Sequence, residues 1–178
     1  NIRLYINGVQ VGTASIGAAS IWQNTVRNLY LFGAWQNTAG STGLNGYVSN
    51  YRLVKGTCLY PGGTTFTVPT TPLTNITNTS LLTCQSSQFI DNSTNAFTIT
   101  TAGNTQPVPA NPFGMTAWSG YFDGTGDYLT VPNNAAFNLG SGDATIEAWV
   151  FPASGGQTCG IFDKRLVGAN YSQFPQVA

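Results

Sequence analysis

The sequence predicts an all-β fold, an antiparallel β-sandwich of two packed sheets, on three observations. No segment keeps a helical hydrophobic period over a useful length. Gly, Pro, Asn and Ser recur about every ten residues, which is the spacing of many short strands joined by turns. The runs between them alternate apolar and polar side chains, the period of two that directs one face of a strand toward a core.

Residues 2–12 predict a β-hairpin. Asn7-Gly8 lies between two alternating runs, and Asn-Gly is the preferred pair for a type I′ turn because both turn residues need a positive φ. Leu4 and Ile6 then share one face of the first strand, and Tyr5 lies on the other.

Two further strands follow along the chain. Residues 28–33 form an apolar run typical of a buried strand. Residues 46–55 alternate throughout, which predicts a strand, but neither face is uniformly apolar and the inward face stays open. One face would carry Val48, Asn50, Arg52 and Val54, and the other Tyr47, Ser49, Tyr51, Leu53 and Lys55.

The remaining elements are separated by two Pro-rich stretches. Residues 61–79 are rich in Pro and Thr without a sustained apolar period, which indicates an extended connector, and residues 107–112 form a second loop of this kind. Strands are predicted at residues 80–84, 96–100, 120–122, 128–131 and 144–151, with turns at 91–95 and 123–126. In the last strand, Ile146, Ala148 and Val150 point one way and Thr145, Glu147, Trp149 and Phe151 the other.

The composition excludes several functional classes. Charged residues make up 7% of the chain and the net charge is zero, against about 25% charged residues in an ordinary soluble domain. The basic residues are scattered, so the chain has neither the footprint of a nucleic-acid-binding protein nor a polybasic membrane patch. No apolar run approaches the roughly 18 residues of a membrane span. The chain begins within a strand pattern and without Met, and we expect it to be a piece of a longer protein.

The three cysteines are Cys58, Cys84 and Cys159. Their odd number and wide spacing argue against a disulfide framework and against a zinc site. We expect each to be a small buried hydrophobic residue. A single disulfide between two of them is compatible with the sequence but is not required.

The titratable residues do not predict an enzyme. The chain has no histidine, which excludes Ser-His-Asp and Cys-His arrangements within it, and no Gly-rich phosphate loop stands between a strand and a helix. Asp91, Asp123, Asp127 and Asp143 lie in turn sequences, where Asp hydrogen-bonds its own backbone. Glu147 lies in a strand, without the second carboxylate that glycoside hydrolysis needs.

Three tryptophans are candidate ligand-binding residues for carbohydrate: Trp22, Trp35 and Trp118. Each lies in or beside a loop, next to amide or hydroxyl side chains, and an exposed ring beside polar groups suits a sugar. The alternative for each is packing against a sheet edge or a neighbouring subunit. Trp149 is assigned to the core.

The sequence resembles laminin G-like domains, which have a concanavalin A-like jelly-roll fold. Residues 121–132 (YFDGTGDYLTVP) and 142–150 resemble the opening strands of such a domain, and residues 81–100 resemble its first strand and turn. Residues 4–9 and 46–53 resemble its closing strands. The order is therefore inverted, with an end first and a beginning last.

Two organisations account for this inverted order. In the first, residues 1–70 are the C-terminal strands of one laminin G-like unit of a tandem array, residues 71–79 are a Thr/Pro-rich connector, and residues 80–178 are the N-terminal strands of a following, truncated unit. In the second, the chain is one permuted sandwich whose two parts complete one another. A chain without its middle strands leaves edges that neighbouring copies can pair, so we expect an oligomer or a fibre.

The resemblance also implies places for calcium. Laminin G-like folds can hold a metal in the turn that here contains Asp91, Asn92 and Asn95. Asp123 with Asp127 offers a second place, because carboxylate and amide oxygens are ligands that Ca²⁺ prefers. A plain Asx-turn is the favoured interpretation of both turns. We expect no required cofactor, with Ca²⁺ as the candidate.

The Thr-, Asn- and Gly-rich, charge-poor composition also resembles repeated domains of phage structural proteins, especially the tail fibres and capsid-surface appendages of marine and cyanobacterial phages. This resemblance implies a non-enzymatic structural or adhesive module at the virion surface. Its expected partners are other copies of itself, other virion proteins and host-surface carbohydrate, with neither nucleic acid nor membrane insertion. The alternative is a secreted microbial carbohydrate-binding module, and a glycosidase fragment is a weaker third.

Overall fold

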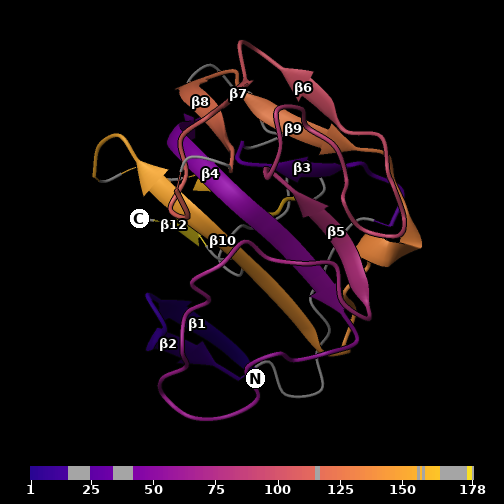
Figure 1. Ribbon diagram of the computed structural model, residues 1–178. Coiled ribbons are helices and arrows are strands. Elements are labelled where there is room, and N and C mark those ends of the chain that lie inside the picture. Colours follow the sequence, from indigo (N-terminus) through magenta and orange to yellow (C-terminus); the bar gives the residue numbers. More distant parts are fainter. Residues whose placement is uncertain are drawn as a thin grey trace.

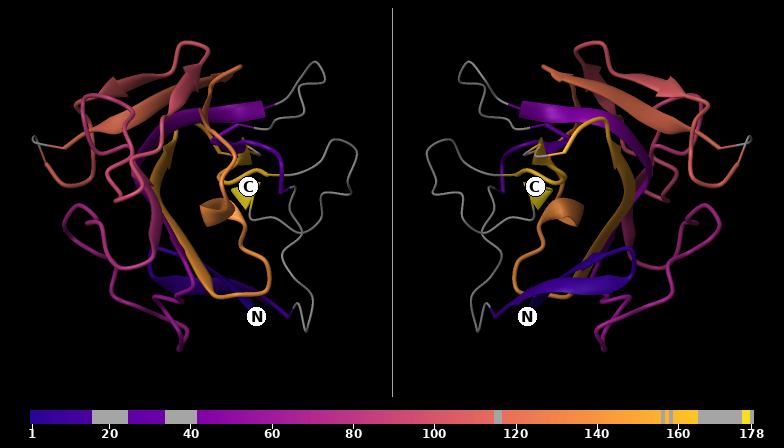
Figure 2. Two further views of the ribbon diagram at one scale, coloured as in Figure 1. Left: turned by 90° about the vertical axis from the view of Figure 1, so that its right-hand side faces the viewer. Right: turned by 90° about the vertical axis from the view of Figure 1, so that its left-hand side faces the viewer.

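A computed structural model describes residues 1–15, 25–33, 42–114, 117–155, 157, 159–164 and 176–177 of the 178-residue chain. Within these ranges the fold is all-β, as the sequence predicts, with antiparallel strands, one 3-10 helix and no α-helix (Figure 1). Two sheets pack face to face, and the larger one curls around the core (Figure 2). The chain is an antiparallel β-sandwich. No helix in the described part is long and apolar enough to cross a membrane.

The larger sheet is built around β4 (Thr42–Lys55). β10 (Ala144–Pro152) runs along one edge of β4. The other edge of β4 is shared by β8 (Ser119–Thr125) and β5 (Thr79–Thr83), and β7 (Gln106–Val108) pairs with β8. Strands from both sides of residues 71–79 thus share one sheet.

The other strands form a smaller sheet and two separate pairs. The smaller sheet has the order β3 (Leu29–Leu31), β9 (Tyr128–Val131), β6 (Thr100–Ala102). β1 (Ile2–Ile6) and β2 (Val9–Ala14) form the predicted hairpin, and β11 (Cys159–Gly160) pairs with β12 (Gln176–Val177). The hairpin turn has φ of 50° at Asn7 and 78° at Gly8, as a type I′ turn requires. The 3-10 helix η1 spans Ala135–Phe137.

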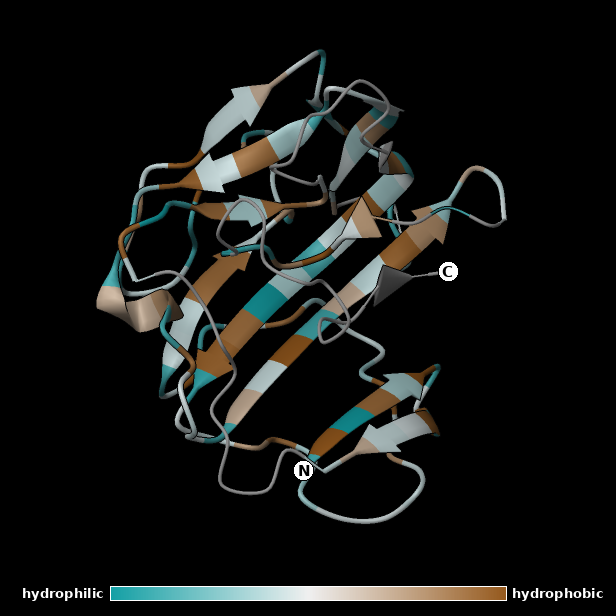
Figure 3. Cartoon of the chain, turned by 180° about the vertical axis from the view of Figure 1, so that it is seen from behind, coloured by the Kyte–Doolittle hydropathy of each residue, from teal (hydrophilic) through white to brown (hydrophobic). Residues whose placement is uncertain are grey.

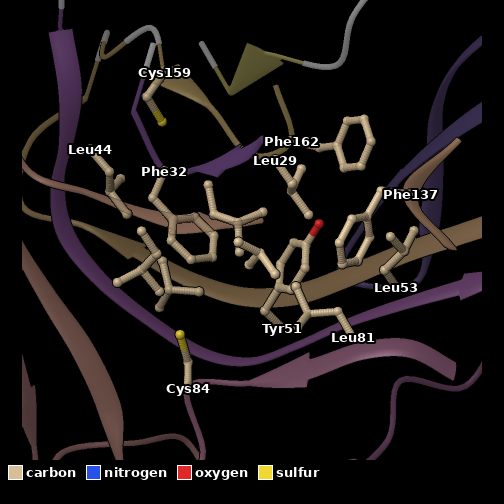
Figure 4. Packing of buried hydrophobic residues seen from close by; sticks show 14 of the residues in the cluster. Leu29, Phe32, Leu44, Tyr51, Leu53, Leu81, Cys84, Phe137, Cys159 and Phe162 are labelled. Carbon is tan, nitrogen blue, oxygen red and sulfur yellow. The ribbon is translucent and has the colours of Figure 1, made fainter. Parts of the chain in front are cut away.

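The core lies between the facing sides of the two sheets (Figure 4). The ring of Phe32 packs edge-on against Tyr51 and Phe122, with ring centroids 5.4 and 5.1 Å away. Burying one such side chain contributes roughly 1.5–3 kcal/mol, so this cluster holds the two sheets together. Its members are Leu29, Leu31, Phe32, Leu44, Val48, Tyr51, Leu53, Leu81, Cys84, Phe122, Leu129, Val131, Phe137, Leu139, Cys159 and Phe162.

A β-bulge at Asn50 decides which face of β4 points inward. Before the bulge, Leu44 and Val48 enter the core cluster, and after it Tyr51 and Leu53 do. Asn50 has a φ of 54°, and the β4–β10 register slips between the pairs Glu147↔Arg52 and Trp149↔Ser49. An extra residue in one strand reverses the alternation. The mixed faces of residues 46–55 are explained by this reversal, and Figure 3 shows how apolar and polar residues alternate along β4 and β10.

One predicted strand is absent, and one cysteine differs from expectation. Residues 96–99 are not in a strand, and β6 begins only at Thr100. The backbone N–H of Phe97 donates instead to Asp91 Oδ2 at 2.9 Å, which keeps this segment in the turn. All three cysteines are free: Cys84 and Cys159 are buried as expected, whereas Cys58 is partly exposed. Burial raises the pKa of the Cys84 thiol to about 12, so this thiol stays protonated.

The Tyr51 hydroxyl provides a first test of the core. It is buried without a hydrogen-bond partner among the described residues, and an unsatisfied buried polar group costs about 1–3 kcal/mol. We therefore expect Tyr51→Phe to raise the free energy of unfolding by about 1–2 kcal/mol. Urea unfolding at pH 8 measures this change, and a loss of stability would show that the hydroxyl has a favourable partner.

The same substitution has an expected pH signature. Burial raises the pKa of Tyr51 above its usual value of 10.0. As the pH rises past 10, the unfolded chain therefore releases the Tyr51 proton before the folded one, and stability falls by about 1.4 kcal/mol per pH unit for this group. Tyr51→Phe removes this contribution, so its advantage over the parent chain should be larger at pH 11 than at pH 8.

Candidate functional site

Three aromatic side chains form a row across the outer face of the larger sheet. Tyr121 on β8 pairs with Tyr47 on β4, and Tyr47 pairs with Phe151 on β10. The ring centroids are 5.2 Å apart for Tyr121 and Tyr47, and 6.3 Å apart for Tyr47 and Phe151. We call Tyr121, Tyr47 and Phe151 the aromatic row.

The inner side of the same strands explains why the row faces outward. Val48 and Phe122 fill the core at this level. Gly120 pairs with Val48, and a Cβ at Gly120 would lie 2.7 Å from the ring of Phe89 and 3.0 Å from that of Phe122. Because side chains alternate along a strand, Tyr47 and Tyr121 must then point away from the core.

The row is accessible and carries unused hydrogen-bonding groups. Phe151 is 69% exposed, and Tyr47 and Tyr121 are half-buried. Neither tyrosine hydroxyl has a hydrogen-bond partner among the described residues. On β7, the exposed side chain of Gln106 stands directly opposite Tyr121 and adds an amide to the end of the row. Three strand spacings give the row with Gln106 a length of about 14 Å.

A second aromatic pair flanks the row. Trp149 on β10 packs edge-on against Phe113, with ring centroids 4.9 Å apart. The assignment of Trp149 to the core is therefore wrong: Ile146, Ala148 and Val150 pack against the core cluster, and Trp149 lies on the opposite face of β10. The side chain of a strand residue can point to either face of its sheet, and only the tertiary structure shows that Trp149 points outward.

Glu147 lies on the same outer face but is held by its neighbours. Its Oε1 lies 2.7 Å from Arg52 Nη2, and both side chains are nearly buried, at 12% and 8% exposure. Its Oε2 accepts a hydrogen bond from the Tyr60 hydroxyl at 2.8 Å, and burial with this bond raises the pKa of Tyr60. Arg52 Nη1 also donates to the carbonyl of Thr74. Both carboxylate oxygens are thus used within the fold.

The residues predicted for calcium hold turns together. Asp91 accepts from the backbone N–H groups of Leu82, Ser93 and Phe97. Asn95 Nδ2 donates to the carbonyls of Thr79 and Ser80, so this turn covers the outer edge of β5, while Asn92 is exposed.

The second predicted calcium turn is arranged in the same way. Asp127 accepts from the N–H groups of Asn104 and Asp123, and Asp123 accepts from that of Thr125. Among described residues, no group of three or more His, Cys, Asp or Glu side chains could hold a metal ion. The Asx-turn geometry is what the structure contains, and calcium binding stays a prediction.

Of the three tryptophans that the sequence predicts for ligand binding, the structure describes one. Trp22 and Trp35 lie outside the described residues. Trp118 is half-buried, and its carbonyl accepts a hydrogen bond from the hydroxyl of Ser49. Sequence reasoning missed Tyr47, Tyr121 and Phe151 as a group, because only the register of β8, β4 and β10 brings them together.

No protein-family model, curated protein or solved structure matches this chain. The geometry of the outer face and the resemblance of the sequence motifs are therefore the two indications of a function.

Proposed function

We propose that this chain is a non-enzymatic adhesive and structural module that binds glycans through the aromatic row, as part of a phage tail fibre or capsid-surface appendage. The observation that supports this proposal is the row itself. It is a solvent-accessible strip of rings on a rigid sheet, and exposed apolar patches on folded domains mark interaction sites.

The chemistry of the row suits a neutral sugar chain. A pyranose presents C–H groups on one face and hydroxyls at its rim, so a ring can stack under it while nearby polar groups bond the rim. Tyr47 and Tyr121 each provide a ring and a hydroxyl that has no partner among the described residues, and Gln106 provides an amide. The chain has zero net charge, which favours a neutral glycan over a charged one.

The state of the carboxylates supports a binding role rather than a catalytic one. Glu147 is paired with Arg52 and Tyr60, and the aspartates of the two turns accept backbone hydrogen bonds. The chain contains no histidine. Hydrolysis of a bound glycan that disappears in a Glu147→Gln variant shown to be folded would instead support the glycosidase alternative.

The phage setting comes from the resemblance of the sequence, and we propose the virion surface as the location on that ground. A secreted carbohydrate-binding module would use the same aromatic row. The two proposals differ in assembly: a particle protein is expected to associate with copies of itself or with other virion proteins, and a secreted module is expected to act alone.

We expect Tyr47→Ala and Tyr121→Ala each to weaken glycan binding about two- to tenfold, because a stacked ring contributes about 0.5–1.5 kcal/mol. The double variant should lose more than either single variant, but not the product of the two losses, because the rings are in contact with centroids 5.2 Å apart. The measurement is a glycan array of neutral oligosaccharides, followed by calorimetric titration of the strongest ligand. Tyr128→Ala is the matched control, since Tyr128 is a half-buried tyrosine on β9 of the other sheet.

Two results would count against the row. Binding that survives the double variant would place the sugar elsewhere. Binding lost equally in Tyr128→Ala would indicate a general effect on folding, which the melting temperature of each variant would reveal.

A further inference from the structure

Among the residues that the structure describes, the outer edge of β10 has no partner strand. β10 pairs with β4 on one side and ends the larger sheet on the other. It is nine residues long, whereas the edge strands β3, β6 and β7 have three residues each. Proteins keep edge strands short or covered because an open edge recruits other strands.

The register identifies which backbone groups of β10 are free. Gly56 N donates to Asp143 O at one end of β10, and Ala153 N donates to Asn45 O at the other. Hydrogen-bonded pairs alternate along an antiparallel ladder, so the odd-numbered residues of β10 face β4. The N–H groups of Ala144, Ile146, Ala148 and Val150 point away from the sheet, and no described residue pairs with them.

Within the described part of the chain, the edge of β10 also lacks the cover that β5 has. The outer edge of β5 is satisfied by the turn at Asp91, through Leu82 N to Asp91 Oδ1 and Asn92 N to Leu82 O. A charged side chain on an edge strand can prevent pairing with another strand. Glu147 of β10 does not act in this way, because it is paired with Arg52. Pro152, at the end of the strand, removes a single donor.

The β1–β2 hairpin lies on the side of β10 that faces away from β4 (Figures 1 and 3). It pairs with no described strand of the larger sheet. Residues 57–66, which we call the strap, connect the two from the outer face. In the strap, Tyr60 bonds Glu147 of β10 and stacks on Phe66, and Phe66 packs edge-on against Tyr5 of β1.

The strap fixes the orientation of the hairpin. Arg3 and Tyr5 donate to the carbonyls of Pro61 and Gly63, so this face of β1 points toward the strap. The opposite face of the hairpin is apolar and 41–55% exposed, and consists of Leu4, Ile6, Val9 and Val11. It points to the same side as the core-facing residues of β10, because the strap contacts the outer face of both elements.

We infer that the edge of β10, beside β1, accepts one extended strand supplied by another polypeptide chain. That strand would pair with β10 and join the hairpin to the larger sheet. Apolar and polar residues would alternate along that strand. The apolar ones would lie on the same face as Ile146, Ala148 and Leu4, and the polar ones would face the strap. We expect the incoming strand to be uncharged, because β10 has no unpaired charge that could pair with one. This inference is independent of the aromatic row.

Hydrogen exchange of the intact chain tests the site directly. The probe is a soluble peptide of alternating Thr and Val flanked by Lys, and the control is the same peptide with a central Pro. With the probe present, we expect the amides of Ala144, Ile146, Ala148 and Val150 to exchange at least tenfold more slowly. The odd-numbered amides, already bonded to β4, should change little.

A variant pair provides a second measurement. Ala148→Pro removes a backbone N–H that points away from β4 and makes no hydrogen bond to it. Ala148→Val keeps this N–H, and its side chain is similar in size to that of proline. Probe binding should fall at least tenfold in the first variant and persist in the second. The exchange measurement decides the question if the proline variant fails to fold.

Two results would overturn the inference. The first is protection of the even-numbered amides in the dilute chain without probe. The second is exchange of these amides that the probe leaves unchanged. Protection that rises with the concentration of the chain alone would support the site and identify a second copy as the strand donor.

Discussion

Glu147→Gln is expected to lower the free energy of unfolding by about 3–5 kcal/mol, because it leaves the Arg52 guanidinium as an uncompensated charge in a nearly buried site. Arg52 and Glu147 stand directly opposite each other on β4 and β10, and their side chains are 8% and 12% exposed. Arg52 also holds the carbonyl of Thr74. Chemical unfolding at pH 7 measures the loss, which is a large share of the stability of an ordinary domain.

A double variant separates the charge from the packing. Arg52→Met with Glu147→Leu replaces the pair by apolar side chains, and such replacements are often neutral or stabilising. We therefore expect each single change to be strongly destabilising and the double variant to recover most of the loss. Single variants that lose less than about 1 kcal/mol would show that water reaches the pair and screens it.

Asn50→Ala is expected to cost about 3 kcal/mol, from two effects at the bulge of β4. The φ of 54° is unfavourable for Ala by about 1 kcal/mol relative to Asn or Gly. The Asn50 side chain, which is fully buried, accepts from Leu73 N at 2.8 Å and donates to the hydroxyl of Ser49 at 2.8 Å. Its loss leaves a buried N–H unsatisfied, at about 1–3 kcal/mol.

Asn50→Gly is the matched control, because glycine keeps the positive φ and loses only the side-chain hydrogen bonds. We expect it to be about 1 kcal/mol more stable than Asn50→Ala. Equal stabilities of the two variants would show that the backbone conformation at the bulge costs nothing. A shift in the β4–β10 register, visible in cross-strand nuclear Overhauser effects, would show that Asn50 holds the register itself.

Local sequence patterns predicted those turns and strands that are determined by a few neighbouring residues. The Asn7-Gly8 turn, the strand at residues 128–131 and the alternation of residues 144–151 were all predicted correctly. The strand at 96–100 was not, because Asp91 draws the N–H of Phe97 into a turn. The Phe97 N–H can bond either to a neighbouring strand or to the side chain of Asp91. Which bond forms depends on the position of Asp91, and the alternation of residues 96–100 does not contain that information.

The outer aromatic row shows the same limit for the candidate site. Tyr47, Tyr121 and Phe151 are far apart in the sequence, and each could have faced the core. Their cross-strand pairs exist only in the register that β8, β4 and β10 adopt together. A search for exposed tryptophans in loops could not find them, since the relevant rings lie on strands.

The sequence by itself determined the all-β class, the hairpin and the antiparallel character, because turn residues and a period of two are local properties of the chain. Only the tertiary structure decided which face of β4 is inside. The bulge at Asn50 reverses the alternation between Val48 and Tyr51, so both can enter the core. The physical reason is that a bulge is stabilised by partners from elsewhere in the chain: Leu73 N–H bonds the Asn50 side chain, and Cys84 O accepts its backbone N–H.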